Sequence, residues 1–219
     1  MFRFFRGGTV DEEAAAHPGS GRNSRRSSGL KEFSKSISGQ EGLCILDLGS
    51  TSAMNISRLT GMGYKVCTED LLEAAHDPLL LVPGEDGKKT IDVVRFLRDS
   101  LAYAPQAFDA VLCWDVPDYL PEPLVKPVVE RLCTLTKPGG ILLAFFHTRD
   151  AGPDAPHYRY HIAGDDMMQL QPTSQRGGTP VYRLQRVFNN RHIENLFREF
   201  ASLKFFLARD NVREVIVVR

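Results

Sequence analysis

The fold is decided by one stretch, Leu43-Cys44-Ile45-Leu46-Asp47-Leu48-Gly49-Ser50-Thr51-Ser52-Ala53. It begins as a short apolar run that favours a strand, and it passes through an acid and a glycine into small residues. The next apolar residues, within 54–59, recur at helical spacing and predict a helix that ends near Gly61. Strand, tight turn and helix in this order predict the opening unit of a doubly wound α/β sheet. Such sheets bind ligands at the carboxyl ends of their strands.

The composition is that of an ordinary globular chain of 219 residues with a formal net charge of zero. A neutral chain has no global electrostatic reason to bind nucleic acid or an anionic membrane, although Arg22, Arg25 and Arg26 form a local basic patch. No apolar run approaches the ~20 residues of a membrane span, and the first residues lack the apolar core of a secretory signal. The 4 cysteines lie far apart, which indicates reduced thiols in a cytoplasmic protein rather than disulfides or a metal site.

Residues 1–28 are rich in Gly, Ser and Arg, and they are expected to form a poorly ordered tail. A solvated tail is the simpler interpretation; a contact for an acidic partner or a lid over the ligand is the alternative. Residues 29–219 are expected to form one domain.

Further strands are predicted at 64–68, 108–115 and 141–146, with a helix over 124–135 and a closing hairpin made by 203–208 and 212–218. Another strand is expected somewhere within 73–101, but periodicity does not place it. The polar segment 148–185 follows a parallel strand, so it is expected to cover the ligand crevice and to contact substrate. His157 and His161 within it are expected to be solvated, and no metal site is predicted.

Several motifs stand in order along the chain: Leu46-Asp47-Leu48-Gly49, then Asp70, then Phe108-Asp109-Ala110-Val111-Leu112-Cys113-Trp114-Asp115, then Lys137-Pro138-Gly139-Gly140, then the closing hairpin. With these motifs, residues 41–219 resemble the class I S-adenosylmethionine-dependent methyltransferases. The resemblance implies a Rossmann-like methyltransferase fold, which is a mostly parallel seven-stranded sheet with an antiparallel last strand. It also implies S-adenosylmethionine as the cofactor.

The resemblance assigns the cofactor contacts residue by residue. Asp47 and Gly49 correspond to the acid and the first glycine of the turn at the cofactor's amino-acid part. Asp70 corresponds to the ribose-binding acid, and its distance from the turn fits that role, although it is also suited to cap a helix at Leu71. Trp114 and Asp115 correspond to the strand end beside the transferable methyl group.

The turn departs from the family pattern, because Thr51 and Ala53 stand where the family has glycines. A β-branched Thr51 is expected to crowd the approach of a ligand to the backbone. The hydroxyl groups of Ser50, Thr51 and Ser52 are the expected replacement, as hydrogen-bond donors to the cofactor's carboxylate.

Methyl transfer to a hydroxyl or amine needs a base that removes a proton, and His147 at the end of strand 141–146 is the first candidate. Its alternative role is a strand-end histidine bonded to the backbone. Asp118 and Tyr119 are expected either to orient the acceptor or to cap the following helix. The expected function is therefore methyl transfer to a small-molecule acceptor, and the oligomeric state is not predicted. The alternatives are a catalytically inactive binding protein with this fold and an NAD-dependent Rossmann enzyme, which the absence of Gly-x-Gly-x-x-Gly disfavours.

Overall fold

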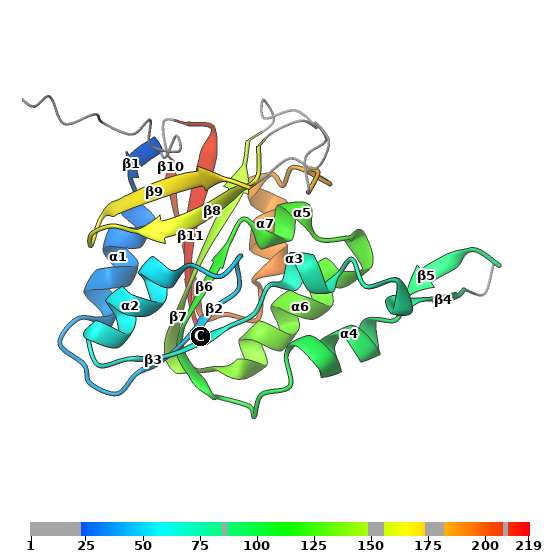
Figure 1. Cartoon of the computed structure of the whole chain (residues 1–219), viewed down its shortest axis with the longest axis horizontal. Helices are drawn as coiled ribbons and strands as arrows, with labels where there is room; N and C mark the ends of the chain where they lie inside the picture. The colour runs from blue at the N-terminus through cyan, green and yellow to red at the C-terminus, as the bar shows by residue number, and fades with distance from the viewer. Residues whose placement is uncertain (1–22, 85–86, 149–155, 174–181, 208–209) are drawn as a thin grey trace, which may run out of the picture.

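Six strands form the central sheet in the computed structural model, which describes residues 23–84, 87–148, 156–173, 182–207 and 210–219. The strands are β2 Cys44–Asp47, β3 Lys65–Thr68, β6 Phe108–Trp114, β7 Thr136–His147, β10 Ser202–Leu207 and β11 Val212–Val218. Their order in the sheet is β10-β11-β7-β6-β2-β3 (Figure 1). Neighbours from β3 to β7 are parallel, whereas β11 is antiparallel to both β7 and β10. The predicted α/β class and the closing hairpin are confirmed.

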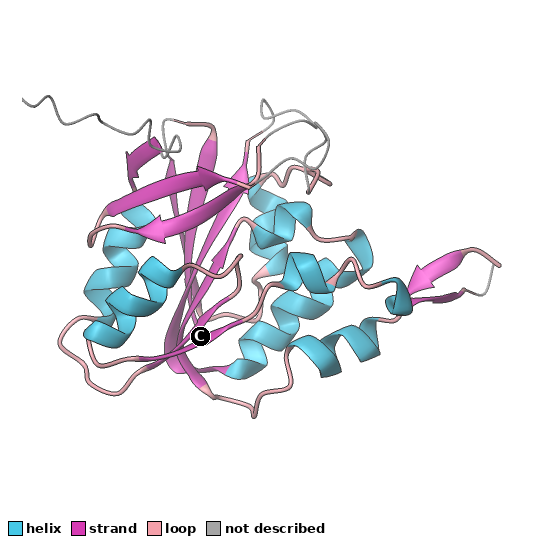
Figure 2. Cartoon of the chain, viewed as in Figure 1, coloured by secondary structure: helices cyan, strands magenta, loops and turns pink. Residues whose placement is uncertain are grey.

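Helices cover both faces of this sheet (Figure 2). Two lie on one face, α1 Ser28–Ile37 and α2 Ala53–Gly61. Five lie on the other, α3 Leu71–Ala74, α4 Val93–Ser100, α5 Val116–Tyr119, α6 Glu122–Leu135 and α7 Asn190–Leu196. The central strands are therefore buried on both sides, and this explains why β6 is an almost unbroken apolar run. In the part of the chain that the structure describes, none of the helices is long and apolar enough to cross a membrane.

The central sheet has six strands in the described residues where the resemblance implies seven. The connection between α3 and α4 contains a short helix, η1 Pro78–Leu80, and two three-residue strands, β4 Leu81–Pro83 and β5 Lys89–Ile91. These two strands pair with each other and project away from the sheet (Figure 1). The segment is mostly exposed and rich in Pro and Gly, so it lacks the apolar run that a buried parallel strand needs.

A second sheet lies across the carboxyl ends of the central strands, over α1 and α2 (Figure 1). It consists of β1 Asn23–Arg26, β9 Met167–Pro172 and β8 Tyr158–Ile162, in this order. The tail expected over 1–28 is thus wrong for its last residues, because 23–26 pair with β9 and Ser27 caps α1 by accepting a hydrogen bond from the Leu30 N–H at 2.9 Å. The rest of the expected tail, 1–22, lies outside the described residues.

Candidate active site

A buried carboxylate and a histidine meet at the end of β7. Asp118 in α5 is 0% exposed, and its Oδ2 accepts hydrogen bonds from the backbone N–H of His147 at 2.6 Å and from the His147 ring Nδ1 at 2.9 Å. Because a carboxylate can only accept, Nδ1 carries the proton, and Nε2 of the neutral ring keeps the lone pair that can accept one. Asp118 therefore fixes both the backbone N–H and the ring of His147.

Burial and charge shift the pKa of each member of this pair in opposite directions. Desolvation raises the pKa of Asp118 to about 6, against the lowering effect of its hydrogen bonds to His147. Desolvation lowers the pKa of His147, but the hydrogen bond and charge of Asp118, together with the charge of Asp115, raise it above its ordinary value overall. Oδ1 of Asp118 has no hydrogen-bond partner among the described residues, although it is buried. Shifted titrations of this kind are typical of catalytic groups.

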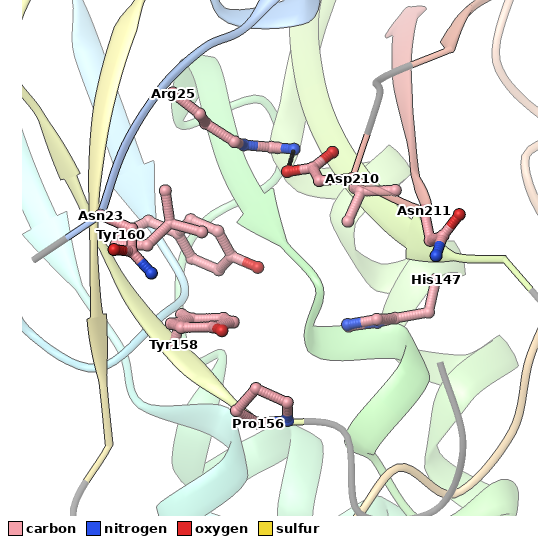
Figure 3. A pocket seen from close by; sticks show the side chains of 10 residues that line it. Asn23, Arg25, His147, Pro156, Tyr158, Tyr160, Asp210 and Asn211 are labelled. Carbon is pink, nitrogen blue, oxygen red and sulfur yellow. Dashed lines mark hydrogen bonds and ion pairs between the residues drawn. The ribbon is translucent and has the colours of Figure 1, made fainter. Parts of the chain in front are cut away.

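His147 faces a cavity of about 470 Å³ between the end of β7, the start of β11 and the second sheet. Figure 3 shows the imidazole on one side and the rings of Tyr158 and Tyr160 on the other. The volume is within the usual range for small-molecule sites, about 300–1,000 Å³. The segment expected to contact substrate, 148–185, does contribute to this cavity through Pro156, Tyr158 and Tyr160.

Arg25 of β1 crosses the top of the cavity (Figure 3). Its guanidinium group pairs with Asp210 and lies 3.3 Å from Oε1 of the buried Glu214, so its charge is compensated. Its Nε and Nη2 are buried and have no hydrogen-bond partner among the described residues. The basic patch that the sequence suggested is therefore not an exposed surface at Arg25, and Arg26 pairs with Asp166 at 2.9 Å.

Tyr119 stands between two histidines. Its ring makes edge contacts with His147 at 5.6 Å and with His157 at 4.8 Å between centroids. His157 and His161 are 5% and 4% exposed, so the expectation that they are solvated is wrong. Both come from the strand region of the second sheet, which packs onto the crevice instead of extending into water.

Asp115 belongs to the same buried group. Its Oδ2 accepts the hydroxyl hydrogen of Tyr160 at 2.8 Å, and its Oδ1 lies 3.8 Å from Nε2 of His157. Burial lowers the pKa of His157, so this ring is neutral at physiological pH. Asp115 thus joins the end of β6 to the second sheet through two side chains.

At the turn after β2, the buried carboxylate is hydrogen-bonded through both of its oxygens. Asp47 is 1% exposed, and its two oxygens accept hydrogen bonds from the Trp114 indole N–H at 2.6 Å and from the Asn55 amide at 3.0 Å. Its bond to the Gly49 N–H is long, at 3.5 Å. Desolvation raises the pKa of Asp47 despite these hydrogen bonds. Trp114 covers Gly49 so closely that a Cβ atom on this glycine would lie 2.8 Å from the indole Cδ1.

The neighbouring Asp70 is half-buried and has freer surroundings. Its Oδ2 accepts the Ser50 hydroxyl at 2.9 Å, and its Oδ1 accepts the Glu73 N–H at 3.1 Å. It therefore caps α3. It also lies beside the turn after β2, in the position where the resemblance expects a ribose-binding acid. Thr51 is exposed.

These residues fit an adenosyl cofactor only in part. A ribose fits beside Asp70 and Ser50, because a half-exposed carboxylate and a hydroxyl match the hydroxyl groups of a sugar. The cofactor's amino-acid part does not fit at Asp47 and Gly49 in this arrangement, because Trp114 lies against the glycine and both carboxylate oxygens are bonded within the chain.

Sequence patterns assign no individual role in this site to four residues: Arg25, which is predicted in a basic patch, Tyr158 and Tyr160, which lie in the segment expected to contact substrate, and Asn55. Tyr158 and Tyr160 are two residues apart in β8, and this strand-like alternation was the available signal. Arg25 lay in the presumed tail, and nothing in the sequence pairs it with residues almost two hundred positions away. Asn55 is a polar residue inside a helix, and most such residues face solvent. Its burial and its hydrogen-bond partners become visible only in the tertiary structure.

Comparison with known proteins identifies the family. A family model described as "Methyltransferase domain" matches residues 21–201. The chain is 30% identical over 133 residues to the "Ubiquinone biosynthesis O-methyltransferase" of Stutzerimonas stutzeri (strain A1501), covering 60% of this chain and 54% of that protein. A protein of the same name from Thiobacillus denitrificans (strain ATCC 25259 / T1) is 30% identical over 132 residues, with the same coverage, 60% and 54%. The chain thus spans about half the length of these curated relatives.

Among solved structures, the PH0226 protein of Pyrococcus horikoshii OT3 has a TM-score of 0.50 and 13% sequence identity, covering 87% of this chain and 88% of that one. This likeness supports the fold. The family model covers well over half of the sequence and agrees with the resemblance seen in its motifs. The chain therefore belongs to the methyltransferase domain family.

Proposed function

We propose that this chain transfers a methyl group from S-adenosylmethionine to a hydroxyl group of a small, planar acceptor bound in the cavity beside His147. The observation that supports this most is the buried Asp118–His147 pair, whose imidazole lines a cavity of about 470 Å³. The family match supports the reaction class, and neither the inactive protein nor the NAD-dependent enzyme is favoured by it.

S-adenosylmethionine, when bound, supplies a methyl group activated by the sulfonium. Displacement at a methyl carbon needs alignment and the exclusion of water more than covalent help from the protein. Nε2 of His147 accepts the proton of the acceptor hydroxyl, and Asp118 keeps Nδ1 protonated and stabilises the imidazolium that results. The rings of Tyr119, Tyr158 and Tyr160 exclude water from this proton transfer.

The cavity walls favour a neutral aromatic acceptor. Tyr158, Tyr160 and Pro156 offer flat or apolar surfaces, and Arg25 has no uncompensated charge to attract an anion. The curated relatives are named O-methyltransferases, and this favours a hydroxyl as the methylated group.

The test is transfer of labelled methyl from S-adenosylmethionine to a panel of phenols, catechols and hydroxylated heteroaromatics. We expect His147→Gln to reduce kcat on the best acceptor by about 10²–10⁴-fold, which is the usual contribution of a general base. His192→Gln is the matched control, because His192 is exposed on α7 and its ring is not in the cavity.

Two results would contradict the proposal. Equal activity of His147→Gln and His192→Gln would remove His147 as the base. If the cofactor binds but no acceptor in the panel is methylated, a catalytically inactive binding protein becomes the better interpretation.

A further inference from the structure

The turn after β2 is filled by the chain itself. The indole of Trp114 lies against Gly49, with Cδ1 at 2.8 Å and Nε1 at 3.4 Å from the position of a Cβ atom on this glycine. A glycine at this position lets a ligand approach the backbone closely. Here the approach is taken by a tryptophan side chain that is 2% exposed.

Trp114 adopts an uncommon backbone conformation to reach this place. Its φ is 50°, in the left-handed region that large side chains rarely occupy. Compensating contacts hold it there: the Tyr160 ring stacks on the indole at 5.1 Å between centroids with an interplanar angle of 7°, and Phe145 lies at 5.6 Å. The unfavourable backbone is therefore offset by aromatic packing and by the hydrogen bond to Asp47.

Asn55 ties the second sheet to the same turn. Its amide donates to Oδ2 of Asp47 at 3.0 Å and to the backbone oxygen of Tyr160 at 3.1 Å, and its Oδ1 accepts the N–H of Ile162 at 2.7 Å. Ser52 adds a hydrogen bond to His161 at 2.7 Å. β8 is thus joined to the turn and α2 by these hydrogen bonds, and each oxygen of Asp47 already accepts a hydrogen bond from within the chain.

The side of the turn toward Asp70, where a nucleoside is expected, is less enclosed. Asp70 and Ser50 are half-buried and hydrogen-bonded to each other, and Thr51 is exposed. Adenosyl compounds that differ only in their amino-acid part should therefore differ in affinity because of Trp114.

We propose that Trp114 determines which adenosyl compounds this chain binds: the crevice accepts the nucleoside part, and the amino-acid part enters only when the indole leaves Gly49. This inference rests on the proposed function, because it concerns the site of the same methyl donor. Trp114 acts here as a specificity-determining residue, and Tyr160 and Asn55 hold it in position.

The experiment is calorimetric titration of the full chain with 5′-methylthioadenosine, which lacks the amino-acid part, and with S-adenosylhomocysteine, which has it. We expect the unmodified chain to bind 5′-methylthioadenosine at least about tenfold more tightly. Trp114→Ala should tighten S-adenosylhomocysteine by about tenfold or more and change 5′-methylthioadenosine by less than about threefold.

Retained binding of 5′-methylthioadenosine shows that Trp114→Ala is folded. If it is not, Trp114→Leu is used, and the ratio of the two affinities in the unmodified chain tests the inference without any substitution. Tighter binding of S-adenosylhomocysteine by the unmodified chain, weakened in Trp114→Ala, would overturn the inference and leave the proposed function intact. Failure of both compounds to bind either protein would overturn both.

Discussion

Two regions at the same edge of the sheet use buried carboxylates in opposite ways. At the turn after β2, both oxygens of Asp47 are bonded to Trp114 and Asn55, and an aromatic side chain occupies the open face of the glycine. At the end of β7, Asp118 binds one nitrogen of His147 and has one oxygen without a partner among the described residues, and His147 itself lines a cavity. A strand-end carboxylate therefore does not identify a ligand site by itself. What distinguishes the two regions is whether the chain already supplies every hydrogen-bond partner.

The largest effect is expected at the cavity. Asp118→Asn should lower kcat for methyl transfer by about 10³-fold, because an amide can donate to Nδ1 of His147 and so move the ring proton to Nε2, which then cannot accept. The carboxylate also raises the pKa of His147, so its loss lowers that pKa. The rate depends on the neutral ring and falls as the pH drops through this pKa.

The acid limb of the pH–rate profile should therefore move to lower pH in Asp118→Asn. The matched control is Asp165→Asn, an exposed acid paired with Arg58, which should leave the profile in place. An unchanged limb in Asp118→Asn, with activity retained, would show that the pair is structural, as at Asp47.

A smaller effect is expected at the turn, on stability. Asn55→Ala leaves Oδ2 of Asp47, the Tyr160 oxygen and the Ile162 N–H without their partners, all in a buried region. We expect it to lower the free energy of unfolding by about 3 kcal/mol, because each unsatisfied buried group costs about 1–3 kcal/mol. Denaturant unfolding measures the change.

Asn190→Ala, at an exposed position in α7, is the control for Asn55→Ala and should stay within about 0.5 kcal/mol. A similar small loss in Asn55→Ala would mean that the second sheet is not held on the turn by this side chain.

The smallest effect is expected at Thr51. Its side chain is exposed, so Thr51→Gly should change the affinity for S-adenosylhomocysteine by less than about twofold, which is below about 0.5 kcal/mol. Restoring this glycine thus tests the crowding that the sequence predicted, with titration of the same ligand as the measurement. A gain as large as that expected for Trp114→Ala would place the obstruction at Thr51 and remove the contrast between the two residues.

The sequence by itself determined the class of fold and the family. The apolar runs of β2, β6 and β7 are buried on both faces of the sheet. Such a run can be predicted from one short segment, because consecutive side chains are apolar instead of alternating with polar ones. The order of strand-end acids, Asp47, Asp70 and Asp115, then indicated one shared edge of the sheet, and His147 and Asp118 were candidates because they follow predicted strands.

Only the tertiary structure decided what each of these acids does. The hydrogen bonds Trp114–Asp47, Tyr160–Asp115 and Arg25–Asp210 join residues 67, 45 and 185 positions apart, and local composition predicted Tyr160 in a polar loop and Arg25 in a tail. Whether a buried polar group is hydrogen-bonded depends on such distant partners, and neither hydrophobic periodicity nor motif spacing predicts them. The same physics explains Trp114: its φ of 50° and its place over Gly49 follow from packing against Tyr160 and Phe145, which no single segment of the sequence contains.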